Sequence, residues 1–322
     1  MILKKRIIGI ICLGAVGKNC AYALLLKGLA DELLLVDIDD KKVQAECQDL
    51  RDAVAWCPHQ TAVKVVDYED LGCCDIIVNS VGNMKLLLET MDRVDELHFN
   101  IAQVNDFIPR VMAGGFDGIF INISNPCDII TWQVARLSGL PKGRVFGTGT
   151  GLDSARLINL LSLQTGVAHR SIQAMMMGEH GAAIMVPWSQ VSLGGKLLNA
   201  FDPADPRFGF DRMAMRKKAE ENAYLVLGGK KCTEYGISTT LCRVAEIVLH
   251  GEKAIIPASM VLDGEYGEHG LCAGVPVLLG ENGVEEVIEY DLPEQERRQF
   301  HECCDAIRHN MTLDDSVIRN CH

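Results

Sequence analysis

The chain has 322 residues, of which 48% are hydrophobic and 23% charged, and its formal net charge is −12. This length predicts two domains or one large domain, and the composition is that of a globular protein with ample material for a core. The acidic balance disfavours nucleic acid and anionic membranes as partners, because both require a basic face. An anionic small molecule stays possible, since a few local arginines suffice to bind it.

The amino-terminal stretch MILKKRIIGIICLGAVG has a basic head and an apolar run, as a signal peptide does. Glycines at turn spacing interrupt the run, so a first β-strand over 6–11 is the better interpretation. No stretch of the sequence reaches the roughly 20 apolar residues of a membrane span. The thirteen cysteines are odd in number, irregularly spaced and without a C-x-x-C pair. We therefore expect free thiols in a cytoplasmic protein and no metal site.

The turn after the first predicted strand is similar to a dinucleotide-binding fingerprint. In a G-x-G-x-x-G turn the backbone approaches a pyrophosphate, and the N-terminus of the next helix points at it. Gly14 and Gly17 occupy the second and third glycine positions, with Ala15 and Val16 between them. Asp37 follows Gly17 by 20 residues, where an acidic side chain binds ribose hydroxyls. Because Asp37 would repel a 2′-phosphate, we expect NAD rather than NADP.

One position departs from this fingerprint. Cys12 stands where the first glycine is expected. A Cβ at this position is expected to crowd the tight turn and to weaken cofactor binding. A βαβ unit without a ligand therefore stays open beside dinucleotide binding.

The first 150 residues alternate short β-branched runs with longer helical patterns, which is typical of a parallel sheet with helices on both faces. After Met91, apolar residues recur every three or four positions until Gly114 and Gly115, which predicts a helix. We expect a Rossmann-type doubly wound sheet in an NAD-binding domain over residues 1–147. Its candidate strands are 6–11, 32–37, 62–66, 75–80, 118–124 and 144–149.

The second half has a different pattern, from which we predict an α+β substrate domain over residues 148–322. Its candidate helices are 151–165, 211–227, 236–249 and 293–310, and its candidate strands are 172–177, 254–263 and 275–279. A hairpin over 186–198 is expected to turn at Gly194-Gly195, and Asn282-Gly283 marks a further turn. No linker separates the halves, which predicts a broad interface between them.

Four further motifs follow one another in the order DRVDELHFN, ISNPCD, TGTGLDSARL and MMMGEHGAA. With them, and with His180 following Asp153 by 27 residues, the chain resembles the L-lactate/malate dehydrogenase family from end to end. The segment VGNMKL before Arg93 is most similar to the L-2-hydroxyisocaproate dehydrogenase branch. The resemblance implies an NAD-dependent oxidoreductase that reduces an aliphatic 2-oxo acid to the L-2-hydroxy acid. It also implies a homotetramer or homodimer with a small-molecule substrate.

The resemblance assigns roles to four polar residues. His180 is the acid/base that protonates the forming alkoxide, and Asp153 fixes the tautomer of its imidazole. Arg156 grips the substrate carboxylate with two parallel N–H groups, which a lysine cannot reproduce. Arg93 polarises the carbonyl as a loop over residues 82–93 closes and excludes water.

The resemblance also implies supporting positions and a substrate class. Asn125 lies near the substrate carbonyl and the nicotinamide ribose, Gly82 lies at the cofactor, and Thr233 lines the substrate pocket. Leu87, within a run of three leucines, stands where malate enzymes carry an arginine for the second carboxylate. Burying an alkyl group on leucines contributes about 1.5–3 kcal/mol, whereas burying an unpaired carboxylate is costly. We therefore expect 2-oxoisocaproate ahead of pyruvate.

Other interpretations stay open for these residues. Each has a plain structural alternative, such as a core histidine, a helix-terminal aspartate, a surface arginine or a turn at Asn125. L-lactate dehydrogenase is the alternative within the family. A non-catalytic NAD-binding sensor, impaired at Cys12, is a rival class, and an NAD-dependent glycosidase with a metal near Cys127 is another. The joint presence of both arginines, the aspartate and the histidine favours the dehydrogenase, because a binding protein does not need all four.

Overall fold

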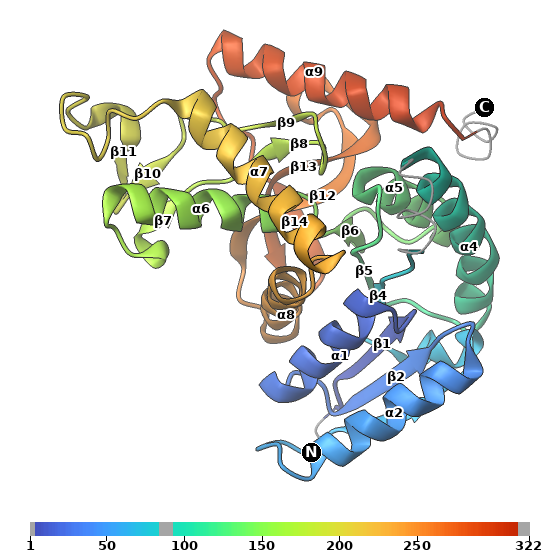
Figure 1. The fold of residues 1–322 in the computed structure, drawn as a ribbon. Helices are drawn as coiled ribbons and strands as arrows, with labels where there is room; N and C mark the ends of the chain where they lie inside the picture. Colours follow the sequence, from blue (N-terminus) through green and yellow to red (C-terminus); the bar gives the residue numbers. More distant parts are fainter. Residues whose placement is uncertain (1–3, 84–92, 315–322) are drawn as a thin grey trace.

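The chain folds around one long mixed sheet (Figure 1). The computed structural model describes residues 4–83 and 93–314, with residues 93 and 94 described by their backbone alone. Six parallel strands form the first part of the sheet in the order β3-β2-β1-β4-β5-β6, which is the order of a doubly wound Rossmann sheet. The predicted fold class is therefore confirmed. The strands are β1 (Ile7–Ile11), β2 (Glu32–Val36), β3 (Ala62–Val65), β4 (Ile76–Asn79), β5 (Ile119–Asn122) and β6 (Val145–Gly147).

Helices cover this parallel part because its central strands are apolar throughout, as is usual for strands buried on both faces. The helix predicted after Met91 is confirmed, and its regularly spaced apolar residues, such as Leu97 and Val104, are almost completely buried. It packs against the helix that follows β5, while the first helix packs against a helix of the second half. These helices are α1 (Ala15–Lys27), α2 (Asp40–Val54), α4 (Arg93–Ala113) and α5 (Cys127–Ser138).

The second half extends the same sheet with antiparallel strands. Ser259 pairs with Gly147 where the two parts of the sheet meet, and the hydrophobic core is continuous across this junction. The predicted broad interface between the halves is thus confirmed. The added strands are β12 (Ala254–Asp263), β13 (His269–Gly280), β8 (Met177–Gly178), β9 (Ile184–Met185) and β14 (Gly283–Val287). The helices are α6 (Gly151–Thr165), α7 (Arg212–Lys230), α8 (Tyr235–His250) and α9 (Glu294–Met311).

Three predicted elements of this half need correction. The strand predicted over 172–177 is two short strands, β7 (Ile172–Gln173) in a small second sheet and β8 in the main sheet. Between them, side-chain hydroxyls take the place of ladder bonds, because Ser154 Oγ accepts from Met176 N–H and Thr150 Oγ1 donates to the Met176 carbonyl. The strand predicted over 275–279 is the second half of the longer β13.

The hairpin predicted over 186–198 is shorter than expected. Only β10 (Ser192–Leu193) and β11 (Lys196–Leu197) pair, and they complete the small sheet with β7. The turn lies at Gly194 and Gly195 as predicted, with φ of 58° and 84°, which favours glycine at both positions.

Two further observations concern the apolar length of the helices and the state of the cysteines. Within residues 4–83 and 93–314, no helix is long and apolar enough to cross a membrane. The twelve cysteines in these ranges are free thiols, as predicted, and most of them are buried.

Candidate active site

The turn between β1 and α1 leaves space for a phosphate group. Gly14 precedes the first turn of α1, and among the described residues no side chain caps this helix N-terminus, whose N–H groups can bind an anion. A Cβ built on Gly14 would meet the Cys12 sulfur at 3.7 Å, so the space in front of the turn stays open. A Cβ on Gly17 would lie 2.0 Å from the Cys12 carbonyl oxygen, so only glycine fits there. The turn therefore fits a dinucleotide pyrophosphate.

Cys12 takes the backbone conformation that a glycine usually provides. Its φ is 73°, in the left-handed region, which costs an L-residue roughly 1–2 kcal/mol. Its N–H donates to the Val36 carbonyl at 2.7 Å, and its own carbonyl accepts from Ser80 Oγ at 2.7 Å. The strain thus lies within Cys12, and the turn keeps its path without the first glycine.

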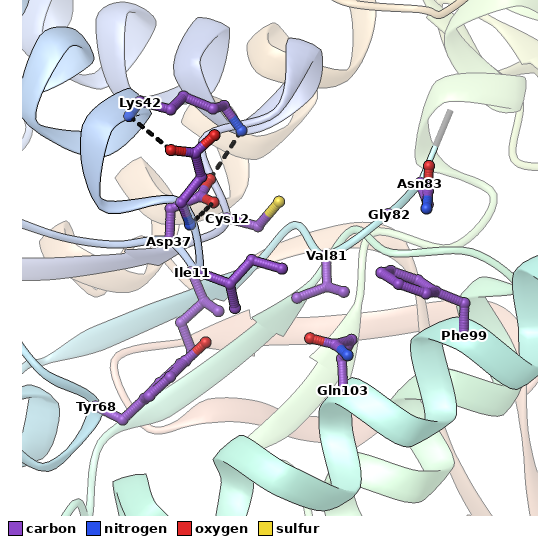
Figure 2. Close-up of a pocket in the computed structure, with 12 residues that line it drawn as sticks. Ile11, Cys12, Asp37, Lys42, Tyr68, Val81, Gly82, Asn83, Phe99 and Gln103 are labelled. Atoms are coloured by element: carbon purple, nitrogen blue, oxygen red, sulfur yellow. Dashed lines mark hydrogen bonds and ion pairs between the residues drawn. The ribbon is translucent and has the colours of Figure 1, made fainter. Parts of the chain in front are cut away.

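Asp37 follows β2 at the edge of a pocket of about 220 Å³ beside this turn (Figure 2). Its carboxylate accepts from Leu13 N–H at 2.7 Å, from Asp39 N–H at 3.0 Å and from Lys42 Nζ at 2.9 Å. Burial raises the pKa of Asp37, but these donors lower it by more, so the pKa lies below its usual value. The group stays ionised, so both of its oxygens can accept hydrogen bonds from hydroxyl groups.

Several residues of this pocket were missed by sequence reasoning. Lys42 could have been suspected from its place in the first turn of α2, and Phe99 and Gln103 from their spacing on one face of α4. Tyr68 has no signal in the sequence. Gly82, which is predicted to lie at the cofactor, is among the residues that line this pocket, and a Cβ there would meet no described atom within 4 Å. The lining residues are Ile11, Cys12, Asp37, Ile38, Asp39, Lys42, Tyr68, Val81, Gly82, Asn83, Phe99 and Gln103.

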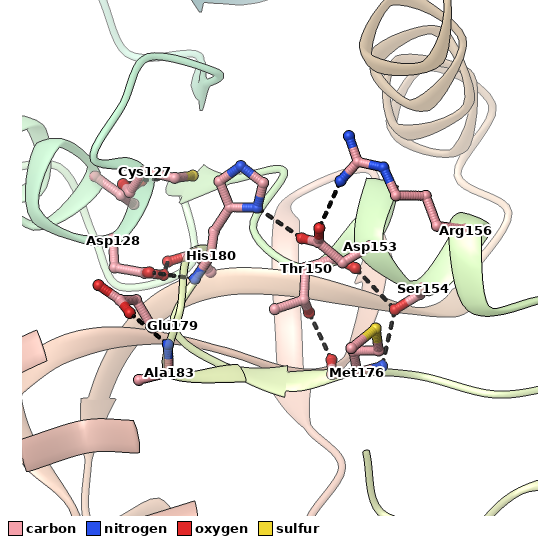
Figure 3. Close-up of polar contacts among 12 residues, drawn as sticks. Cys127, Asp128, Thr150, Asp153, Ser154, Arg156, Met176, Glu179, His180 and Ala183 are labelled. Carbon is pink, nitrogen blue, oxygen red and sulfur yellow. Dashed lines mark hydrogen bonds and ion pairs between the residues drawn. The ribbon is translucent and has the colours of Figure 1, made fainter. Parts of the chain in front are cut away.

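His180 lies in the loop between β8 and β9, and its ring contacts Asp153 on α6. Its Nδ1 lies 2.7 Å from Asp153 Oδ2, and Asp153 Oδ1 accepts from Arg156 Nη1 at 2.7 Å. Figure 3 shows the carboxylate of Asp153 between the imidazole and the guanidinium. Asp153 and Arg156 are three positions apart on a helix and so share a face. The structure brings these three predicted residues together.

The charges of this group favour a protonated imidazole. Burial lowers the pKa of His180, but the negative charge and hydrogen bond of Asp153 outweigh it, with Asp128 adding to the effect. The pKa of His180 is therefore raised above its usual value. Burial raises the pKa of Asp153, but His180 and Arg156 lower it by more, so the carboxyl stays ionised.

Asn125 precedes a cis peptide bond with Pro126, in the turn between β5 and α5, and its side chain is exposed. Its carbonyl accepts from Asn100 Nδ2 on α4 at 2.6 Å. Asn100 Oδ1 is buried and has no hydrogen-bond partner in the described part of the chain. Below the turn, Asn122 Oδ1 accepts from Asn79 Nδ2 at 2.9 Å. Asn125 is thus presented to solvent by a well-braced turn.

Three predicted site residues are placed less completely. α4 begins at Arg93, and Leu87 lies outside the described residues, as does most of the predicted closing loop. Thr233 lies just before α8, and a Cβ built on nearby Gly236 would be 3.6 Å from Thr233 Cγ2 and 2.7 Å from Leu152 Cδ1. Because Leu152 precedes Asp153, Thr233 lies close to the start of α6.

In residues 4–83 and 93–314, no group of three or more His, Cys, Asp and Glu side chains is arranged to hold a metal ion. Cys127, on which the glycosidase interpretation depends, is buried, and burial raises its pKa to about 12.

The chain matches two family models along most of its length. The NAD binding domain of lactate/malate dehydrogenase matches residues 6–147, and the alpha/beta C-terminal domain of the same family matches residues 150–316. The first of these models indicates that the cofactor is NAD(H).

The chain is similar to named relatives and to a solved structure. It is 39% identical over 308 residues to the L-lactate dehydrogenase of Fusobacterium nucleatum, covering 95% of this chain and 96% of that protein. It is also 39% identical to L-lactate dehydrogenase 2 of Listeria monocytogenes, over 95% of this chain and 98% of the relative. The minor L-lactate dehydrogenase of Enterococcus mundtii, in its ligand-bound form, has a TM-score of 0.89 at 34% identity, covering 95% and 97% of the two chains.

All three proteins are named for lactate and none for hydroxyisocaproate. They therefore support the lactate alternative better than the hydroxyisocaproate branch suggested by the segment VGNMKL. With matches over nearly its whole length, this chain belongs to the lactate/malate dehydrogenase family of NAD-dependent enzymes.

Proposed function

We propose that this chain is an L-lactate dehydrogenase that reduces pyruvate with NADH. The proposed reaction class rests on the contact of His180 with Asp153, which also binds Arg156. The dinucleotide turn in the same chain supports it. The names of the relatives support pyruvate as the 2-oxo acid. NADH supplies a hydride to the carbonyl carbon when it is bound. Its pyrophosphate would lie at the turn of Gly14, Ala15, Val16 and Gly17, with Asp37 at the adenosine ribose and Asn125 at the nicotinamide ribose.

The chain's own residues provide the proton. Because Asp153 occupies Nδ1 of His180, the other ring nitrogen, Nε2, is the atom that faces the substrate. The imidazolium donates its Nε2 proton to the carbonyl oxygen as negative charge develops there. The proton on Nδ1 stays hydrogen-bonded to Asp153, which keeps the neutral imidazole in one tautomer.

The arginines bind and polarise the substrate. Arg156 uses one nitrogen for Asp153, and its remaining N–H groups can pair with the substrate carboxylate. Arg93, at the first residue of α4, is proposed to polarise the carbonyl. Thr233 is proposed to line the side-chain end of the pocket.

2-Oxoisocaproate is a second candidate substrate, and the leucine run around Leu87 favours it. Both candidates carry a single carboxylate, which Arg156 would pair. The same leucines disfavour oxaloacetate, whose second carboxylate would be buried without a partner.

The first test compares NADH oxidation with pyruvate, 2-oxoisocaproate, phenylpyruvate and oxaloacetate. We expect the highest kcat/KM with pyruvate, and a highest value with 2-oxoisocaproate would select the second candidate. Efficient use of oxaloacetate would contradict the substrate class. Tight NADH binding without turnover of any of the four would make the non-catalytic sensor the better interpretation.

Two variants test the assigned roles. Loss of a general acid lowers rates by about 10²–10⁴-fold, so His180→Gln should lower kcat by that factor. Arg156→Lys keeps the charge but loses the paired donors, so it should mainly raise KM for the 2-oxo acid. Both should bind NADH as the wild type does, measured by fluorescence titration.

A further inference from the structure

A second carboxylate lies behind His180, in the first turn of α5. Asp128 Oδ2 accepts from the backbone N–H of His180 at 2.8 Å, and Oδ1 accepts from Ser259 Oγ at 2.5 Å. Figure 3 shows Asp128 and Asp153 on either side of His180, one at its main chain and the other at its ring. Asp128 is only 2% exposed and Ser259 is completely buried. The general acid thus lies between two carboxylates.

The buried charge of Asp128 is an energetic cost to the fold. Burial raises the pKa of Asp128 to about 6, although its two donors and His180 oppose this rise. A neutral side chain would avoid much of that cost, because an ionised group is expensive to remove from water. The carboxylate at this position therefore calls for a role besides packing.

The groups around Asp128 leave His180 as its main electrostatic partner. Buried thiols on three elements face it, namely Cys127 on α5, Cys272 on β13 and Cys304 on α9, and burial raises the pKa of each, so they stay neutral. Glu179, next to His180, is an acidic group whose charge also acts on Asp128. His180 in turn is acted on by Asp153, Asp128 and Arg156.

We propose that Asp128 is a positioning residue of the reaction, which holds the main chain of His180 and favours the protonated imidazole by its negative charge. The inference rests on the proposed role of His180 as the acid/base. Reduction of the 2-oxo acid starts from the imidazolium, whereas oxidation of the hydroxy acid starts from the neutral imidazole. Asp128 therefore biases the enzyme toward reduction as pH rises through neutrality.

The contacts also explain how His180 keeps its place. Ser259 belongs to β12, at the point where this strand pairs with β6, and Asp128 belongs to the helix that follows β5. Through these two residues, the loop that carries His180 is attached to both parts of the sheet. These contacts thus fix the loop that carries the imidazole relative to the first half of the chain.

Asp128→Asn removes the charge and can keep both contacts. The amide oxygen can accept from His180 N–H, and the amide nitrogen can donate to Ser259 Oγ. In the pH profile of kcat/KM for reduction, we expect the apparent pKa to fall by about one unit. Reduction above neutral pH should then fall by up to about tenfold, whereas below both pKa values it should approach the wild-type rate. Hydroxy-acid oxidation should extend to lower pH.

Two control variants separate charge from packing. Ser259→Ala keeps the carboxylate and removes one of its donors, so the apparent pKa should shift in the same direction by less. Glu268→Gln removes another buried carboxylate, which contacts His301 and Arg308 instead, and should leave the profile unchanged. The imidazole pKa of His180, measured by NMR in the NAD-bound protein and assigned with His180→Gln, gives a readout that does not depend on turnover.

The outcomes of this experiment are distinguishable. An active wild type whose Asp128→Asn variant keeps the same profile and the same imidazole pKa overturns the inference and leaves the proposed function intact. A wild type without turnover overturns the proposed function, and the NMR titration still decides whether Asp128 acts on His180. If Asp128→Asn does not fold, Ser259→Ala decides, and the absence of any shift overturns the inference.

Discussion

Cys12 shows how one strained residue can serve a binding turn. Its left-handed backbone brings its carbonyl oxygen against Gly17, so the strain at one position and the requirement for glycine at the other have a common origin. Ser80 fixes that carbonyl from the end of β4. The shape of the turn therefore depends on the backbone of Cys12 and on its partner more than on the thiol.

Substitutions at Cys12 should separate backbone strain from packing. Cys12→Gly is expected to raise the free energy of unfolding by about 0.5–1 kcal/mol, because glycine adopts this conformation without steric cost. Cys12→Val should lower it by about 1–2 kcal/mol, since a β-branched residue is a clear outlier there. Urea denaturation measures both, and NADH titration reports the effect on the cofactor. A less stable glycine variant would mean that the buried sulfur outweighs the strain.

At the level of residues, the sequence predicts which side chains lie together where their proximity follows from spacing. Asp153 and Arg156 are three positions apart in a predictable helix, and family resemblance supplied the distant His180. Asp128 could not be assigned in the same way. Its partner is a backbone N–H 52 positions away, and no pattern of residue types indicates a main-chain contact.

Among the elements, the turn from β5 into α5 is braced by buried amides. Asn122 Nδ2 donates to the carbonyls of Ser124 and Cys127, while its Oδ1 accepts from Asn79. Every one of these residues is buried, so each group depends on this hydrogen bond, which water cannot supply there. This network holds the turn on which Asn125 stands.

Asn122→Ala is expected to destabilise the protein by about 2–4 kcal/mol, because it removes several hydrogen bonds and leaves buried groups without partners. Asn125→Ala is the matched control in the same turn. Its exposed side chain should contribute within about 0.5 kcal/mol. Chemical denaturation of the two variants measures the difference, and equal losses of stability would contradict the bracing role of Asn122.

Element prediction succeeded where apolar periodicity was long. α4 and α6 have the predicted extents, and β12 matches its predicted range. It failed over 172–177, where the hydroxyls of Thr150 and Ser154, at the start of α6, replace the ladder bonds of a continuous strand. Such bonds come from residues distant in sequence, so local pattern cannot reveal them.

In the molecule as a whole, one sheet and one main core run through both halves. The parallel direction of the first six strands was predicted from the alternation of strands and helices. The antiparallel continuation into β12 and β13 was not, because strand pairing between distant segments leaves no mark in either segment. This continuity predicts a single cooperative unfolding transition rather than two.

Ligand binding should shift that single transition. At an NADH concentration of about 100 times Kd, the expected stabilisation is about 2.7 kcal/mol, seen as a rise in Tm. NADPH at the same concentration should give a smaller rise, because the ionised Asp37 repels a 2′-phosphate. Scanning calorimetry measures both, and equal shifts would contradict the expected preference for NAD.

The junction of β6 with β12 sets a limit on recombination between relatives. A Cβ on Gly147 would collide with Thr131 and Cys127, and Ser259 opposite it also binds Asp128. A chimaera that joined the first half of this chain to the second half of another dehydrogenase would inherit only one side of this seam. Unless the incoming strand brought a matching serine, Asp128 would lose one of the two donors that hold it against the main chain of His180. We therefore expect the two halves to function only when both come from the same parent protein.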